Sequence, residues 1–83
     1  MKITQHSDNL WQLTRLVAFS CYLVRESDQL TLVDTNLAGS ATSILQAAGT
    51  IGLPITRVVL THAHGDHAGS LDEVVQQLPG VEV

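Results

Sequence analysis

A segment with helical periodicity lies between two short apolar runs rich in β-branched residues, and this arrangement constrains the fold more than any other feature. The runs are Leu30–Asp34 and Arg57–Thr61. The apolar residues that repeat at helical spacing between them are Ile44, Leu45, Ala48 and Ile51. Strand, helix and strand in this order form a βαβ unit, so part of the sheet is expected to be parallel, with helices packed on one face.

The residues before this unit predict antiparallel strands. Ile3–Leu13 alternates weakly, which favours an edge strand or a short hairpin with Trp11 and Leu13 on the same face. Leu16–Arg25 is rich in β-branched and aromatic residues, and a polar turn separates it from Leu30–Asp34. Two such runs joined by a short turn predict a β-hairpin.

The residues after the βαβ unit extend the same pattern. Arg57–Thr61 does not alternate, which predicts a strand covered on both faces. Ser70–Glu73 matches a capping box and opens an apolar stripe that predicts a second helix. Val81–Val83 then resembles the opening of another strand, and the chain stops inside it. We therefore expect a layered α/β fold, with a mixed sheet and two helices, in which residues 1–83 form a single unit.

Composition excludes several classes of protein. Hydrophobic residues make up 45% and charged residues 14% of the chain, which is typical of a globular domain with a well-supplied core. A net charge of −4 with four cations leaves no basic stripe for nucleic acid. Cys21 is the only cysteine, so an internal disulfide is excluded. No apolar run is long enough to span a bilayer and no targeting segment is evident, so we expect a cytoplasmic protein without membrane contact.

Three of the four histidines lie within six residues, together with one carboxylate. The cluster directly follows a predicted buried strand, where open α/β sheets bind ligands. Residues two apart on an extended segment point the same way, so His62 and His64 can bind one ion. Gly65 frees the backbone to turn, so Asp66 and His67 can serve a second ion nearby.

The types of these side chains indicate which metal they bind. Imidazole nitrogens and a carboxylate suit zinc, and no cysteine lies near the cluster to complete a closed structural site. The sequence therefore predicts an open, catalytic site with one or two zinc ions. Iron and manganese are the alternatives.

The segment from His62 to His67 resembles the H-x-H-x-D-H motif of the metallo-β-lactamase superfamily. The strand before it, the small residues after it, and Leu32-Val33-Asp34-Thr35 are also similar to that family. The resemblance covers nearly the whole chain, as the first part of the family's domain. It implies the N-terminal half of a four-layer αββα sandwich.

The resemblance also implies roles for individual residues. His62 and His64 would join a later histidine at the first metal, and Asp66 and His67 would belong to the second, completed by a later aspartate and histidine. The chain thus holds four ligands and lacks three. A hydroxide held by the ions would attack a carbonyl or phosphoryl centre. Asp66 would orient that hydroxide and is the predicted catalytic residue.

The leading interpretation is a zinc-dependent hydrolase of an ester, thioester, lactone or related small-molecule bond. One alternative is an iron-dependent persulfide dioxygenase, which shares the motif and uses only its first metal position. Another is a truncated half-domain without activity, which binds metal weakly. Metal analysis separates the first two, and downstream ligands would separate the enzyme from the half-domain.

The remaining candidates have simpler interpretations. Asp34 either forms a turn at the end of its strand or, as the resemblance implies, accepts a hydrogen bond behind a metal-ligating histidine. His6 is expected to be a solvated surface residue. Cys21 and Trp11 are expected to pack in the core.

The expected partners are a small-molecule substrate and a second polypeptide surface. A half-sandwich would expose the sheet face that its missing half covers, which favours association into a homo-oligomer. We expect the 83-residue chain either to come from a longer protein or to associate, and not to be a competent hydrolase alone.

Overall fold

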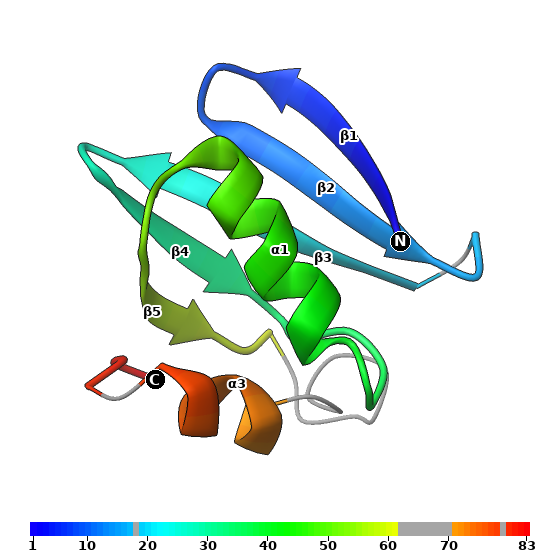
Figure 1. Ribbon diagram of the computed structural model, residues 1–83. Coiled ribbons are helices and arrows are strands. Elements are labelled where there is room, and N and C mark those ends of the chain that lie inside the picture. The colour runs from blue at the N-terminus through cyan, green and yellow to red at the C-terminus, as the bar shows by residue number, and fades with distance from the viewer. Residues whose placement is uncertain (18, 62–70, 79) are drawn as a thin grey trace.

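A computed structural model describes residues 1–17, 19–61, 71–78 and 80–83. Figure 1 shows one sheet with a helix lying across it. The sheet has five strands in the order β1-β2-β3-β4-β5. Their bounds are β1 Lys2–Ser7, β2 Leu10–Arg15, β3 Phe19–Glu26, β4 Gln29–Val33 and β5 Ile55–Val59. The helices in the described ranges are α1 Ala41–Ile51 and α3 Leu71–Gln77.

The mixed sheet confirms the predicted pairing of strands. Each of the first four strands pairs antiparallel with the next one in the sequence, as expected for strands joined by short turns: β1 with β2, β2 with β3, and β3 with β4. β4 and β5 pair parallel and α1 connects them, so the βαβ unit is confirmed. The C-terminal residues also behave as a strand opening, because Glu82 forms a parallel bridge with Arg57 of β5.

The core lies between the helices and one face of the sheet. Alternate residues of the inner strands, among them Leu13, Leu23 and Leu32, are fully buried. They form one cluster with Ile44 of α1 and Val74 of α3, so both helices cover the same face. Trp11 and Cys21 belong to this cluster too, which confirms their predicted packing role. Within the described residues, no helix combines the length and apolar character that crossing a membrane requires.

The opposite face of the sheet corrects one prediction. Arg57–Thr61 was expected to be covered on both faces, but Val58 is 1% exposed and Val59 is 43% exposed. β5 also begins at Ile55, two residues earlier than predicted. β-branched residues favour a strand whether their side chains are buried or exposed. An apolar run without alternation therefore does not show how much of the second face is covered.

The start of β3 corrects another prediction. Leu16 and Val17 were expected to open that strand, which instead begins at Phe19. Both residues have a positive φ, of 53° and 68°, and lie in the turn after β2. Positive φ is uncommon for a bulky side chain, and a β-branched residue is a genuine outlier there, so the sequence carried no signal for it.

The C-terminus of α1 gives a matched pair of glycine substitutions. Gly52 caps the helix at a φ of 89°, whereas Gly49 lies inside the helix, and an added Cβ meets nothing within 4 Å at either position. Gly52→Ala should lower the free energy of unfolding by about 1 kcal/mol, because alanine is strained at that φ. Gly49→Ala should raise it by about 0.5–1 kcal/mol. Urea unfolding followed by circular dichroism measures both, and equal shifts in one direction would contradict the cap geometry.

Candidate metal site

The predicted metal ligands His62, His64, Asp66 and His67 lie outside the described residues. Their assignment stays a prediction. Among the residues that are described, no group of three histidine, cysteine, aspartate or glutamate side chains could hold a metal. What the structure places are the flanks of the motif, at Thr61 before it and Leu71 after it, together with Asp34.

Three strands, β2, β4 and β5, end at the same end of the sheet. β4 and β5 are parallel, and β2 shares their direction because β2 and β4 are each antiparallel to β3. Arg15, Asp34 and Thr61 therefore lie at the same end of the sheet. The predicted ligands follow Thr61 directly in the sequence. This is the carboxyl end of the parallel strands, where α/β sheets bind ligands.

Asp34 is bound to the residue that precedes the motif. Its Oδ1 accepts a hydrogen bond from the Thr61 amide at 2.9 Å, and the Thr61 hydroxyl lies 3.1 Å from Oδ1 and 2.9 Å from Oδ2. The Asp34 amide in turn donates to the Val59 carbonyl at 2.8 Å. Asp34 is 4% exposed, so these bonds are shielded from solvent on its side. The carboxylate thus fixes the path of the chain as it leaves β5.

The loop after Asp34 is held from two other elements. The Arg15 guanidinium at the end of β2 donates to the Ala38 carbonyl at 2.8 Å and to the Ser40 hydroxyl at 3.1 Å. From α3, the Glu73 carboxylate accepts a hydrogen bond from the Gly39 amide at 3.1 Å. Both flanks of the predicted motif are therefore tied to one segment, residues 34–40: Thr61 through Asp34, and α3 through Glu73.

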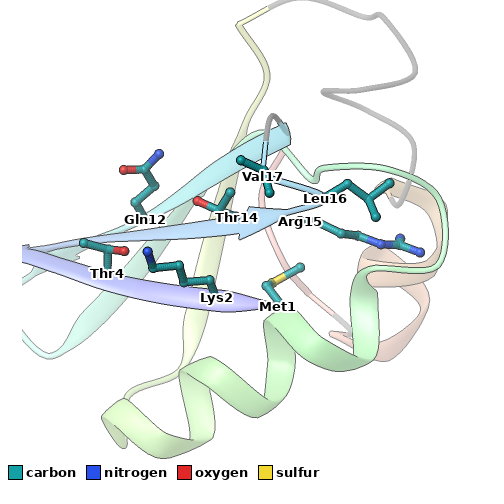
Figure 2. A pocket seen from close by; sticks show the side chains of 8 residues that line it. All are labelled: Met1, Lys2, Thr4, Gln12, Thr14, Arg15, Leu16 and Val17. Atoms are coloured by element: carbon teal, nitrogen blue, oxygen red, sulfur yellow. The ribbon is translucent and has the colours of Figure 1, made fainter.

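A hollow of about 580 Å³ opens beside β1 and β2 at this end of the sheet (Figure 2). Its lining combines two of the four cations of the chain with hydroxyl, amide and apolar side chains. The lining residues are Met1, Lys2, Thr4, Gln12, Thr14, Arg15, Leu16 and Val17. Leu16 and Val17 are 70% and 95% exposed, so the turn after β2 presents apolar side chains to solvent here. Such a lining can contact both an apolar group and a negative charge.

The other titratable candidates have structural roles. His6 is exposed, as predicted, and its Nε2 shares a hydrogen bond with Gln12 Oε1 at 2.8 Å. Cys21 is fully buried, and burial raises the pKa of its thiol to about 12. The thiol therefore stays protonated at neutral pH and is a poor nucleophile.

Asp34→Ala should weaken both folding and metal binding. Removing the Asp34 carboxylate, which accepts the hydrogen bonds from Thr61, should lower the free energy of unfolding by about 2 kcal/mol, a value typical of hydrogen bonds to a charged group. Zinc affinity should fall about 10–100-fold, as it does when a group supporting the ligands is removed. Chelator competition measures the affinity. The control is Asp28→Ala, which removes the same charge from a side chain that is 93% exposed, and equal zinc affinity in both variants would contradict the role.

Comparison with known proteins identifies the family. The family model for the metallo-beta-lactamase superfamily matches residues 15–83. The chain is 46% identical over 86 residues to the uncharacterized protein YobT of Bacillus subtilis (strain 168), covering all of this chain and 36% of that protein. A hydroxyacylglutathione hydrolase of Xanthomonas euvesicatoria pv. vesicatoria (strain 85-10) is 44% identical over 45 residues, which cover 54% of this chain and 18% of that enzyme.

Solved structures agree with this assignment. A beta-lactamase from Chitinophaga pinensis superposes with a TM-score of 0.80 at 28% identity, over 94% of this chain and 30% of that one. The class B3 di-zinc metallo-beta-lactamase LRA-12 from an Alaskan soil metagenome gives a TM-score of 0.81 at 25% identity, with the same coverage.

The chain therefore belongs to the metallo-beta-lactamase superfamily and corresponds to the N-terminal part of its domain. This confirms the resemblance noted from the sequence and the layered fold class that it implied. The chain spans 36% of the length of the Bacillus relative and 30% of the length of the two solved beta-lactamases.

Proposed function

We propose that this chain is the metal-binding part of a zinc-dependent hydrolase acting on an ester, thioester, lactone or related small-molecule bond. One observation carries the proposal: the His62–His67 cluster directly follows Thr61, which Asp34 binds at the carboxyl end of the parallel strands, where α/β sheets usually bind ligands. Membership of the superfamily supports it, as does the similarity to an enzyme named hydroxyacylglutathione hydrolase. A cytoplasmic location is part of the same proposal.

The donor set fits zinc. His62 and His64 would hold one ion, and Asp66 and His67 a second; one solved relative is a di-zinc enzyme. Bound zinc lowers the pKa of water to near neutrality and stabilises negative charge on a polarised carbonyl or phosphoryl oxygen. Iron or manganese would be held by the same nitrogen and oxygen donors.

The chain's own residues would divide the remaining work. The Asp66 carboxylate would accept a hydrogen bond from the attacking water and so orient it. Asp34 would keep Thr61, and with it the start of the motif, in a fixed place.

The test is zinc-dependent turnover. Metal-free protein is loaded with zinc or with iron, its metal content is measured, and ester, thioester and lactone substrates are assayed with and without a chelator. Hydrolysis that needs zinc supports the proposal. Persulfide oxidation that needs iron would favour the dioxygenase instead, and metal uptake without turnover would favour a half-domain that lacks activity by itself.

The partner of the exposed sheet face is proposed to be a second copy of the chain. A row of paired residues crosses that face from Gln12 through Tyr22 and Val33 to Val59, and all four retain some exposure. We expect the chain to sediment as a dimer or larger species, and Val59→Lys to shift it toward monomer because a charge would be buried in the contact. The control is Val75→Lys on α3, where Val75 is 38% exposed. A wild-type chain that is monomeric at every concentration would contradict this proposal.

A further inference from the structure

The turn after β4 contains an unusual pair of backbone conformations. Asp34 and Asn36 each have a φ of 63°, and neither is glycine. Both residues are buried, at 4% and 0% exposure. Aspartate and asparagine tolerate this region better than other side chains, but such a conformation persists only where the surroundings hold it. Some group must therefore lock this turn.

The Asn36 side chain supplies that lock. Its Nδ2 donates to the Leu13 carbonyl of β2 at 3.3 Å and to the Phe19 carbonyl of β3 at 3.1 Å. Its Oδ1 accepts a hydrogen bond from the Leu37 amide at 2.8 Å. Both amide protons and the amide oxygen thus have partners on three different segments. An apolar side chain at this position would remove the bonds that Asn36 makes to the Leu13 and Phe19 carbonyls and to the Leu37 amide.

By holding this turn, Asn36 also influences the position of the Asp34 side chain. Asn36 is two residues from Asp34, whose carboxylate is bound to the amide and hydroxyl of Thr61. The Asn36 side chain therefore binds the β2–β3 hairpin and the Asp34 side chain binds Thr61, and the short backbone of the turn connects the two residues. Thr61 is the last residue before His62.

We propose that Asn36 is a positioning residue, which sets the start of the metal motif through Asp34 and Thr61. The inference rests on the proposed metal site, and it adds a residue that is not among the predicted ligands. A role in stability alone would affect all parts of the fold together. A positioning role predicts a local effect at Thr61 and at the metal.

The test compares Asn36→Gly with a distant variant. Glycine tolerates the φ of 63° and removes every side-chain hydrogen bond of Asn36, including its contact with Cys21 Sγ at 4.0 Å. Ile55→Val is the control, because Ile55 is 5% exposed at the opposite end of β5 and loss of one methylene causes a modest, general destabilisation. Sucrose is added to both samples to favour the folded state. Asn36→Asp, which tolerates the same φ and keeps the Leu37 bond but loses both donors, is the second variant should the glycine variant not fold.

The first measurement needs no metal. Native-state hydrogen exchange of the Thr61 amide is compared with exchange of the Ile44 amide in the core helix. In Asn36→Gly the Thr61 amide should exchange about tenfold faster relative to Ile44, the factor expected from losing one or two ordinary hydrogen bonds. In Ile55→Val the ratio should not change. An unchanged ratio in Asn36→Gly would overturn the proposal.

The second measurement is zinc affinity by chelator competition. Asn36→Gly should raise the dissociation constant about tenfold, at the lower end of the effect of groups that support metal ligands. Ile55→Val should leave it within about twofold of the wild-type value. Faster Thr61 exchange with unchanged zinc affinity would overturn the positioning role. A wild-type chain that takes up no zinc would overturn the proposed function itself, and this is seen before any variant is compared.

Discussion

Replacing His62 and His64 together with alanine is expected to lower the zinc affinity of the chain by more than about 100-fold. The two imidazoles lie two residues apart in the sequence, directly after the strand that ends near Thr61, and an extended backbone would direct both to one ion. Removing direct ligands should cost more than the 10–100-fold typical of removing a supporting partner.

Chelator competition measures this loss, with His6→Ala as the matched control. His6 is exposed and its ring is bonded to Gln12, so its removal should leave zinc affinity unchanged. The wild-type affinity should also fall below about pH 6, because protonated imidazoles do not bind metal. An unchanged affinity in the double variant would exclude these residues as ligands.

Asp66→Asn is expected to abolish hydrolysis while leaving the first metal largely bound. The carboxylate is assigned to the second ion and to the attacking water, whereas the first ion relies on His62 and His64. Asparagine has nearly the same shape but carries no charge and is a weaker proton acceptor. Activity and metal content should therefore separate, with turnover reduced at least about 100-fold.

The measurement uses the protein in the form that shows hydrolase activity, with turnover and bound zinc determined on the same sample. The control is Asp72→Asn, a similar change at an exposed residue in the first turn of α3. Full hydrolytic rate in Asp66→Asn would refute the catalytic role. Loss of both metals would instead show that Asp66 is needed for the first site as well.

The layered fold could be predicted because burial imposes periodicity on the sequence. Residues such as Ile44 of α1 and Leu32 of β4 are buried at regular spacings, and turns rich in glycine or polar residues separate the runs. The parallel pairing of β4 with β5 then followed from the helix between them. These signals are local, so one sequence suffices to read them.

The turn after β2 shows where local signals fail. Leu16 and Val17 favour a strand by residue type, yet they adopt a positive φ and are largely exposed. The prediction that β5 is covered on both faces was wrong for a related reason. Valine is usually buried, so the residue type alone predicts a buried Val59, which is in fact exposed. In both cases the outcome depends on what surrounds the segment in space, which residue type does not report.

The candidate site divides in the same way. Its expected ligands could be named because their types and spacing are contiguous in the sequence. The residues that frame it could not, because Asn36, Arg15 and Glu73 each bind a segment between 17 and 34 positions away. Nothing in the sequence around Asn36 distinguishes it from any other asparagine in a turn, so its bonds to the two distant carbonyls could not be predicted.

The anchoring of both motif flanks to residues 34–40 has a thermodynamic consequence. Bringing the ends of a flexible loop together costs entropy, and that cost must be met either by the ion or by the protein. Here the side chains of Asp34 and Glu73 supply these contacts themselves, Asp34 with Thr61 before the motif and Glu73 with Gly39 from α3 after it. Zinc uptake should then resemble ligand binding to a prepared receptor, with a small change in heat capacity, and not a metal-driven folding reaction.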